Sequence, residues 1–246
     1  MLDRSPYAPI AGFDWSPDGR WIAYSCALSF HTSAIRVCKV ETGEIFSVTR
    51  PVLQDVSPTF DPDGKYLYFL SYREFDPVYD NLHFDLGFPR GVRPYLVTLK
   101  RDLPNPFVPV PKAPEEKNQK SEEKKDGEKT EQLIEIDFEG IEDRVLAFPV
   151  PDGRYQQIAA IKNKVLYTSL PIEGSLAMNW FQLTEPPAKA TLEVYDFESL
   201  KAETLISGIT NFKLSDDRKT LVYRAGNRLR VLKAGEKPDE KSASEP

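Results

Sequence analysis

The chain has 246 residues, and its 32 Lys and Arg against 38 Asp and Glu give a formal net charge of −6 at pH 7. This acidic balance argues against a protein that binds nucleic acid mainly through phosphate contacts. No apolar run approaches the ~18 residues of a membrane-spanning helix, and the first residues, MLDRSPYAPIAG, lack the basic and apolar regions of a signal peptide. We therefore expect a cytoplasmic chain whose partners include no nucleic acid and no membrane.

The first predicted group of elements is a four-stranded meander. We expect its strands at GFDWS, RWIAYSCAL, AIRVCKV and IFSVT. The turn Pro17-Asp18-Gly19 suits a hairpin because Pro fixes φ near −65°, Asp bonds to nearby backbone and Gly accepts a positive φ. Cys26 and Cys38 lie on adjacent strands but not opposite each other, so we expect two free thiols, which also fits a reducing compartment.

The same pattern recurs three times along the chain. The second copy repeats the turn at residues 61–64 and ends with a strand at EQLIEIDF. The third begins with the strand DRVLAFPV and turns at Pro151-Asp152-Gly153, and the fourth turns at Asp216-Asp217-Arg218 and lacks its last strand. We place the four copies at residues 10–50, 55–138, 141–207 and 209–234.

Repeated meanders predict an all-β fold of the β-propeller type. A single four-stranded meander leaves its edges and one face uncovered, and stacking several around an axis buries them. About four antiparallel blades within residues 1–236 indicate a partial or open propeller, which two copies of the chain could close by self-association. The charged, apolar-poor insert at residues 110–131 is expected to be disordered, and residues 237–246 are expected to be a linker tail.

Catalytic and metal-binding motifs are missing from the sequence. It has only His31 and His83, and it contains no GxSxG elbow, HExxH pair, CxxC or Gly-rich phosphate loop. The DPDG turn at residues 61–64 does not read as a calcium loop, since the twelfth position from Asp61, where such a loop closes with Glu, is Tyr72. We predict no catalytic residues, no metal and no cofactor.

The insertion at residues 72–94 is the candidate functional segment. It mixes aromatic side chains with arginines and aspartates, so it could contact peptides or another domain through stacking surfaces and arginine forks. A self-packed loop whose charges pair with one another explains the same composition. The residues we name as candidates for the peptide or interdomain contact are Arg73, Asp76, Tyr79, Phe84, Arg90 and Arg93.

Several stretches resemble a known family. WSPDGRWIAYS resembles TolB-like propellers in general. SYREFDPVYDNLHFDLGFPRGVRPYLVTL, DLPNPFVP and IDFEGIEDRVLAFPVPDGRY together resemble the seven-bladed propeller of Tricorn proteases, over most of the chain. The resemblance implies a cytoplasmic serine protease, assembled as a hexamer, that shortens peptides and admits them through the propeller channel. Its catalytic Ser, His and Glu belong to a region with no counterpart here.

Two functions follow as hypotheses. In the first, the chain is a noncatalytic propeller segment of a Tricorn-like serine protease, acting as scaffold and as channel or filter for peptides. Its partners are then peptides, the remaining domains of the protease and further copies of itself. In the second, it is a free-standing TolB/WD40-like module for protein–protein interaction. A prolyl oligopeptidase-like hydrolase ranks last, since the sequence has no nucleophile elbow.

Overall fold

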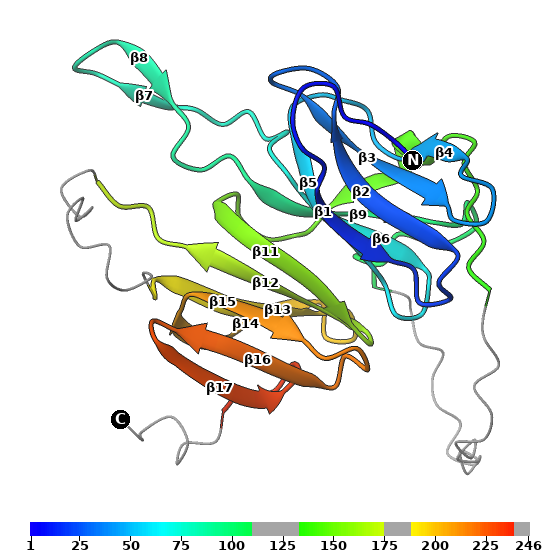
Figure 1. The fold of residues 1–246 in the computed structure, drawn as a ribbon. Helices are drawn as coiled ribbons and strands as arrows, with labels where there is room; N and C mark the ends of the chain where they lie inside the picture. The colour runs from blue at the N-terminus through cyan, green and yellow to red at the C-terminus, as the bar shows by residue number, and fades with distance from the viewer. Residues whose placement is uncertain (110–132, 175–187, 239–246) are drawn as a thin grey trace.

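The computed structural model describes residues 1–109, 133–174 and 188–238, and in these ranges the chain is almost entirely β. Four antiparallel sheets follow one another along the chain as the blades of a four-bladed β-propeller (Figure 1). The only helix in the described ranges is the 3-10 turn Ile141–Arg144. The predicted all-β, propeller-type fold is confirmed.

The first blade has the strand order β1-β2-β3-β4, and the second has β5-β6-β9-β10. Between β6 and β9 the chain leaves the second blade and forms a separate two-stranded hairpin, β7-β8. The strands are β1 Ala11–Trp15, β2 Trp21–Ala27, β3 Ser33–Lys39, β4 Ile45–Ser47, β5 Asp55–Phe60, β6 Tyr66–Ser71, β7 Val78–Asp80, β8 Asp85–Gly87, β9 Arg93–Thr98 and β10 Val145–Ala147.

The third blade has the order β11-β12-β13-β14, and the fourth has only β15-β16-β17 in the described part of the chain. This agrees with the predicted loss of the last strand. The strands are β11 Arg154–Ile161, β12 Lys164–Leu170, β13 Ala190–Asp196, β14 Lys201–Ile209, β15 Asn211–Leu214, β16 Thr220–Ala225 and β17 Arg228–Lys233. The predicted disordered insert 110–131 and most of the predicted tail lie outside the described residues.

Tight turns join the first two strands of the first, second and fourth blades at the predicted positions. In the first blade Gly19 donates its N–H to the carbonyl of Ser16 over 2.9 Å and has φ +69°. Gly64 repeats this geometry in the second blade with φ +68°. In the fourth blade the same position is occupied by Arg218 at φ +56°, a conformation that side chains with a Cβ rarely adopt.

The predicted last strand of the second blade is wrong. Of this segment the structure describes residues 133–138, and these do not pair in the sheet. Strand β10 occupies the edge instead, with Val145 opposite Val97. The alternation of EQLIEIDF has the period of a strand, but Ile134 bonds elsewhere: its N–H donates to Asp18 Oδ2 and its carbonyl accepts from Trp21 Nε1. The alternating apolar side chains serve to cover the seam between two blades.

The predicted start of the third blade is also wrong. DRVLAFPV supplies β10 of the second blade, and residues 151–153 form the connection between blades. The first hairpin of the third blade turns at Lys162 and Asn163, since Ile161 faces Lys164 across the pair. Asn163 has φ +58°, which asparagine tolerates better than most residues. This two-residue turn contains neither Gly nor Pro, so the sequence carries no strong signal for it.

Three hydrophobic clusters lie between successive blades. The first joins blades one and two, the second joins blades two and three, and the third joins blades three and four. A smaller cluster covers the other face of the first blade. Among the described residues no cluster joins the fourth blade to the first. Representative fully buried side chains are Ile35, Phe60, Phe69, Leu96, Tyr167 and Leu221.

A single arginine links the fourth blade to the inner strands of the other three. The side chain of Arg218 donates through Nη1 to the carbonyls of Phe60 and Ala160, at 2.8 and 3.0 Å. Its Nη2 lies 3.4 Å from Asp14 Oδ2. These acceptors belong to β5, β11 and β1, so one guanidinium touches every other blade. We call this set the Arg218 crossbar.

Cys26 and Cys38 are free and buried, which confirms the predicted thiols. No helix in the described ranges is long and apolar enough to cross a membrane.

Candidate functional site

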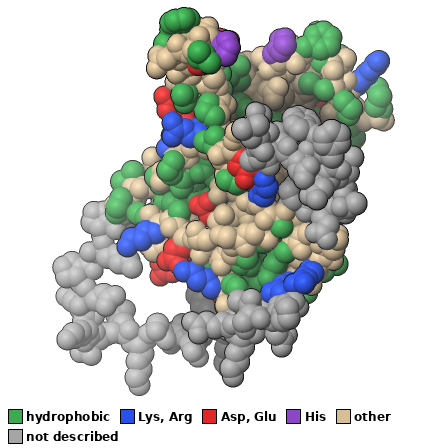
Figure 2. Space-filling model, turned by 90° about the vertical axis from the view of Figure 1, so that its left-hand side faces the viewer, with side chains coloured by type: hydrophobic (Ala, Val, Ile, Leu, Met, Phe, Trp, Pro, Cys, Tyr) green, Lys and Arg blue, Asp and Glu red, His purple; other side chains and the backbone are tan. Residues whose placement is uncertain are grey.

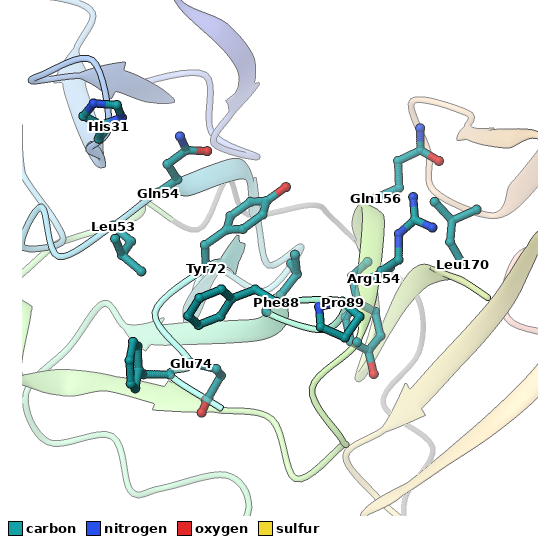
Figure 3. Close-up of a pocket in the computed structure, with 15 residues that line it drawn as sticks. His31, Leu53, Gln54, Tyr72, Glu74, Phe88, Pro89, Arg154, Gln156 and Leu170 are labelled. Atoms are coloured by element: carbon teal, nitrogen blue, oxygen red, sulfur yellow. The ribbon is translucent and has the colours of Figure 1, made fainter. Parts of the chain in front are cut away.

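A pocket of about 750 Å³ opens where the first three blades meet the insertion between β6 and β9. Its walls come from the β2–β3 loop, the connection into β5, the insertion and the start of β11 (Figure 3). We call it the interblade pocket. The residues that line it include His31, Leu53, Gln54, Tyr72, Glu74, Phe75, Phe88, Pro89, Arg154, Tyr155, Gln156 and Leu170.

Aromatic side chains of the insertion form one wall of this pocket. Phe75 and Phe88 lie at the two ends of the excursion, and their ring centroids are 5.5 Å apart. Both are more than half exposed, and Tyr72 is 41% exposed. Large apolar surfaces that stay open in a concave site can accept apolar or aromatic groups of a ligand.

The third blade adds polar side chains to the pocket. Arg154 at the start of β11 is exposed and donates one hydrogen bond, from Nη1 to the carbonyl of Pro171 over 3.2 Å. Gln156 is exposed beside it and stands at an irregularity of the β11–β12 register, between Tyr155 and Gln157. In Figure 3 the side chains of Arg154 and Gln156 lie across the pocket from His31 and Gln54. An exposed cation and open aromatic rings in one pocket suit a ligand that carries a carboxylate and apolar side chains.

Glu74 provides the acidic group of the pocket, but it already has partners. Its Oε1 accepts hydrogen bonds from the Tyr95 hydroxyl and from Arg93 Nη1, the latter at 3.2 Å. The hydrogen bond from Tyr95, followed by the Arg93 contact, holds the pKa of Glu74 below its usual value despite partial burial. Burial and then the Glu74 carboxylate raise the pKa of Tyr95. Glu74 is therefore ionised at neutral pH and orients the insertion.

A second ion pair fixes the point where the insertion leaves β6. Asp55 is 2% exposed, and Arg73 Nη2 lies 2.6 Å from its Oδ2. Ser71 donates to the other carboxylate oxygen over 2.6 Å and accepts from Arg73 Nε. The Arg73 guanidinium also lies 5.3 Å from the ring centroid of Tyr95. The root of the insertion is thus built from satisfied, largely buried charges.

The six predicted site residues separate into two groups, and none of them lines the pocket. Arg73 and Arg93 are in the ion pairs at the root, and Arg90 is half-buried near the return to β9. The other three, Asp76, Tyr79 and Phe84, are exposed on the β7–β8 excursion. Their roles in peptide or interdomain contacts stay predictions.

Sequence reasoning missed Arg154, Gln156 and the pocket role of His31. Arg154 follows Pro151-Asp152-Gly153, whose composition predicts a hairpin turn, so the sequence does not indicate that Arg154 begins an inner strand. A signal was available for Arg218, since it stands where Gly19 and Gly64 stand in the related turns. A bulky residue at a glycine position indicates that its side chain is used.

The histidines show which acid–base pairs the described part of the chain contains. His83 pairs with Asp80 at 3.0 Å on an exposed turn. Among the described residues, no serine hydroxyl or cysteine thiol hydrogen bonds to a histidine ring, as a nucleophile–base pair would require.

Comparison with known proteins gives the chain a family context. A family model described as "Tricorn protease second beta propeller domain" matches residues 1–235. A Tricorn protease homolog of Saccharolobus solfataricus is 35% identical over 240 residues, which is 97% of this chain and 20% of that protein. Tricorn protease homolog 1 of Streptomyces coelicolor is 35% identical over 248 residues, covering 99% of this chain and 22% of that protein.

A solved structure agrees with the sequence matches. The crystal structure of the tricorn protease superposes with a TM-score of 0.73 at 27% identity, covering 94% of this chain and 24% of that one. The chain thus spans about a fifth to a quarter of the length of the proteins it matches.

Proposed function

The chain belongs to the family of Tricorn protease second β-propeller domains, and from that premise we propose that it is a noncatalytic part of a Tricorn-like serine protease. In this role it serves as a scaffold and as a surface past which peptides reach the peptidase. The remaining domains of such a protease and its peptide substrates are the proposed partners. Relatives named as proteases are about five times as long as the stretch they share with this chain, which leaves room for a peptidase elsewhere.

The observation that carries the peptide role is the interblade pocket. It brings the open rings of Tyr72, Phe75 and Phe88 and the exposed Arg154 into one pocket. Peptides in extended form offer apolar side chains and a terminal carboxylate, and these are the groups that the rings and the arginine complement. The fixed charges at the root hold the aromatic wall in place, so little ordering is needed on binding.

Fluorescence anisotropy with labelled peptides tests the proposal. The probe is a set of fluorescein-labelled, unstructured peptides of about ten residues with a free C-terminal carboxylate and one aromatic side chain. We expect saturable binding to the 246-residue chain without cleavage. Tyr72→Ala and Arg154→Ala should each weaken binding at least about fivefold, which corresponds to about 1 kcal/mol.

The matched control is Leu229→Ala, on β17, whose side chain is 72% exposed and lies outside the pocket. It should leave peptide affinity unchanged. Binding that is equally strong in the Tyr72 and Arg154 variants would remove the pocket from the proposal. Hydrolysis of the peptides by the rigorously purified chain would overturn its noncatalytic character.

The free-standing interaction module is the less favoured function, because the family match runs through residues 1–235 and the relatives are named as proteases. The predicted self-association stays a prediction. Light scattering coupled to size exclusion, over a tenfold range of concentration, tests it.

A further inference from the structure

The hairpin between Asp76 and Phe88 projects from the body of the molecule. Strands β7 and β8 pair only with each other, with Val78 opposite Gly87 and Asp80 opposite Asp85. In Figure 1 this hairpin stands apart from the blades at the upper left. We call residues 76–88 the arm.

Apolar side chains cover the arm although it is exposed. Isolated two-stranded hairpins are marginally stable in water, and exposed apolar patches usually mark contact surfaces. Figure 2 shows hydrophobic side chains gathered along the top of the molecule, at the height of the arm in Figure 1. The exposed fractions are 45% for Val78, 53% for Tyr79, 78% for Leu82, 76% for Phe84, 48% for Leu86 and 51% for Phe88.

The charge of the arm has one sign. The sequence from Asp76 to Phe88 contains three aspartates and no Lys or Arg. Asp80 receives the N–H groups of Leu82 and His83 and contacts the His83 ring, so it shapes the turn as well as charging it. A surface that combines apolar area with negative charge is complementary to an apolar groove whose rim carries Lys or Arg.

Ion pairs tie the root of the arm to the second blade, while the hydrogen bonds described at its tip lie within the hairpin itself. The buried Asp55 pairs with Arg73 on the outgoing side, and Glu74 pairs with Arg93 and Tyr95 on the returning side. A self-packed loop would instead fold its aromatics onto its own blade, and Phe84 at 76% exposure does not do so. The Asp55–Arg73 pair is largely buried and the Glu74–Arg93 pair partly so, and both tie the residues from which the arm emerges to the second blade.

We propose that the arm is a docking element that inserts into an apolar, Lys- or Arg-rimmed groove on another domain of the larger protein to which this chain belongs. This rests on the proposed function, because it requires that further domains exist. The relatives share only 20–22% of their length with this chain, so most of the protein surface available to the arm lies outside the residues described here. Asp76, Tyr79 and Phe84 are then interdomain contact residues.

Site-specific photocrosslinking in the full-length gene product tests this. The photoreactive p-benzoyl-phenylalanine replaces Tyr79, and the adduct is located by mass spectrometry. We expect an adduct in a different domain, beside at least one Lys or Arg. The same group in place of Phe30, which is 80% exposed on the β2–β3 loop, is the control and should give at least about tenfold less of this adduct.

Variants that remove the charge of the arm test whether the rim of the proposed groove carries Lys or Arg. Asp76→Asn, Asp80→Asn and Asp85→Asn together remove the charge, while Asn at position 80 can still accept the turn hydrogen bonds. This variant should lower the adduct yield at least fivefold. A matched variant with Glu41→Gln, Glu44→Gln and Glu198→Gln, all exposed and distant in sequence from the arm, should not.

The contrary outcomes are distinct. An adduct to residues 1–246 of a second copy would make the occupant another propeller segment and overturn the proposal, as would an adduct confined to the arm itself or none at all. Peptide hydrolysis is measured in the same samples. An interdomain adduct in a preparation that neither binds nor hydrolyses peptides would contradict the proposed function and leave the docking arm standing.

Discussion

The second and fourth blades are built from the same repeat but have different surroundings. In β6 of the second blade, Leu67 and Phe69 face the first cluster while Tyr68 and Leu70 face the next, so side chains on both faces of the strand are buried. In β16 of the fourth blade, Leu221 and Tyr223 are buried and Val222 is 37% exposed. The burial pattern along a strand therefore shows whether its blade packs against other blades on one face or on both faces.

This difference indicates where the stability of the chain resides. Each blade buries little by itself, and the free energy of folding comes mainly from the clusters between blades. The second blade contributes to two such clusters and the fourth to one. The fourth blade has an additional link to the others, because the Arg218 crossbar hydrogen bonds to backbone carbonyls of the second and third blades.

The largest expected effect comes from the core of the second blade. Phe69 is fully buried, and its ring stacks 5.8 Å from that of Tyr95. Phe69→Ala should lower the free energy of unfolding by about 3–5 kcal/mol through lost burial and a cavity. Leu229→Ala in the fourth blade should change it by less than about 0.5 kcal/mol. Urea denaturation of both variants measures the contrast, and equal losses would contradict the comparison.

The next largest effect is expected at Asp55, which with Asp61 is one of two buried carboxylates among the described residues, both in the second blade. Asp55→Ala leaves Arg73 without its carboxylate in a site with little solvent access. We expect a loss of about 3 kcal/mol, since breaking a buried pair leaves an uncompensated charge. The control is Glu142→Ala, which removes an exposed partner of Arg50 and should cost less than about 1 kcal/mol.

Hydrogen exchange of the arm sharpens this prediction. In the Asp55→Ala variant, amides at the root of the arm should exchange faster, while those of the β16–β17 pair keep their rates. Unchanged exchange at the root would mean that the ion pair does not hold the arm.

A feature of this fold can be predicted from the sequence when residues close together in the chain determine it. The hairpin turns at Gly19 and Gly64 and the free thiols follow from local chemistry, and both are confirmed. The position of EQLIEIDF was not predictable, because its alternation fits a paired strand and an unpaired cover equally well. Only competition with β10 for one sheet edge decides between them.

The candidate site was predicted only in part, for the same reason. The insertion at residues 72–94 is recognisable by its aromatic and charged composition, and it does form one wall of the pocket. Which of its arginines are already paired depends on Asp55 and on Glu74, and these contacts exist only in the folded chain. Arg154 lies in the third blade, and the turn pattern predicts the boundaries of that blade wrongly. The sequence therefore does not place Arg154 beside the insertion.

A smaller effect is expected at the crossbar. Arg218→Ala removes two hydrogen bonds to carbonyls and the contact with Asp14 and keeps a Cβ at φ +56°. We expect a loss of about 2 kcal/mol. Arg218→Gly removes the same contacts but fits the backbone, so it should be about 1 kcal/mol more stable than the Ala variant.

Small-angle scattering separates the crossbar from a purely local turn effect. If Arg218 holds the fourth blade against the others, both variants should increase the radius of gyration by a similar amount. A loss of stability that Gly restores fully, with an unchanged radius, would mean that the guanidinium contacts contribute nothing.

The smallest net effect is expected where the second blade departs from the first and fourth. Ser16 and Ser215 begin their turns, and each hydroxyl accepts the N–H five residues later. Asp61 holds this position in the second blade, is 4% exposed, and accepts from the Lys65 N–H. Burial raises the pKa of Asp61 to about 6 from its ordinary 3.8. The folded chain therefore holds a proton there that the unfolded chain has already lost between these two pH values.

Because the folded chain binds the extra proton, the free energy of unfolding falls as pH rises from about 4 to about 6. The fall is at most about 1.4 kcal/mol for each unit by which the pKa is raised, and the free energy stays at the lower value above pH 6. Asp61→Ser keeps the turn acceptor and removes the charge. We expect a net gain of about 1 kcal/mol at pH 8, since the smaller side chain also loses contacts, and no gain at pH 4. Urea midpoints at both pH values measure this. A variant less stable than the parent at pH 8 would show that the ionised carboxylate is accommodated and that the turn requires it.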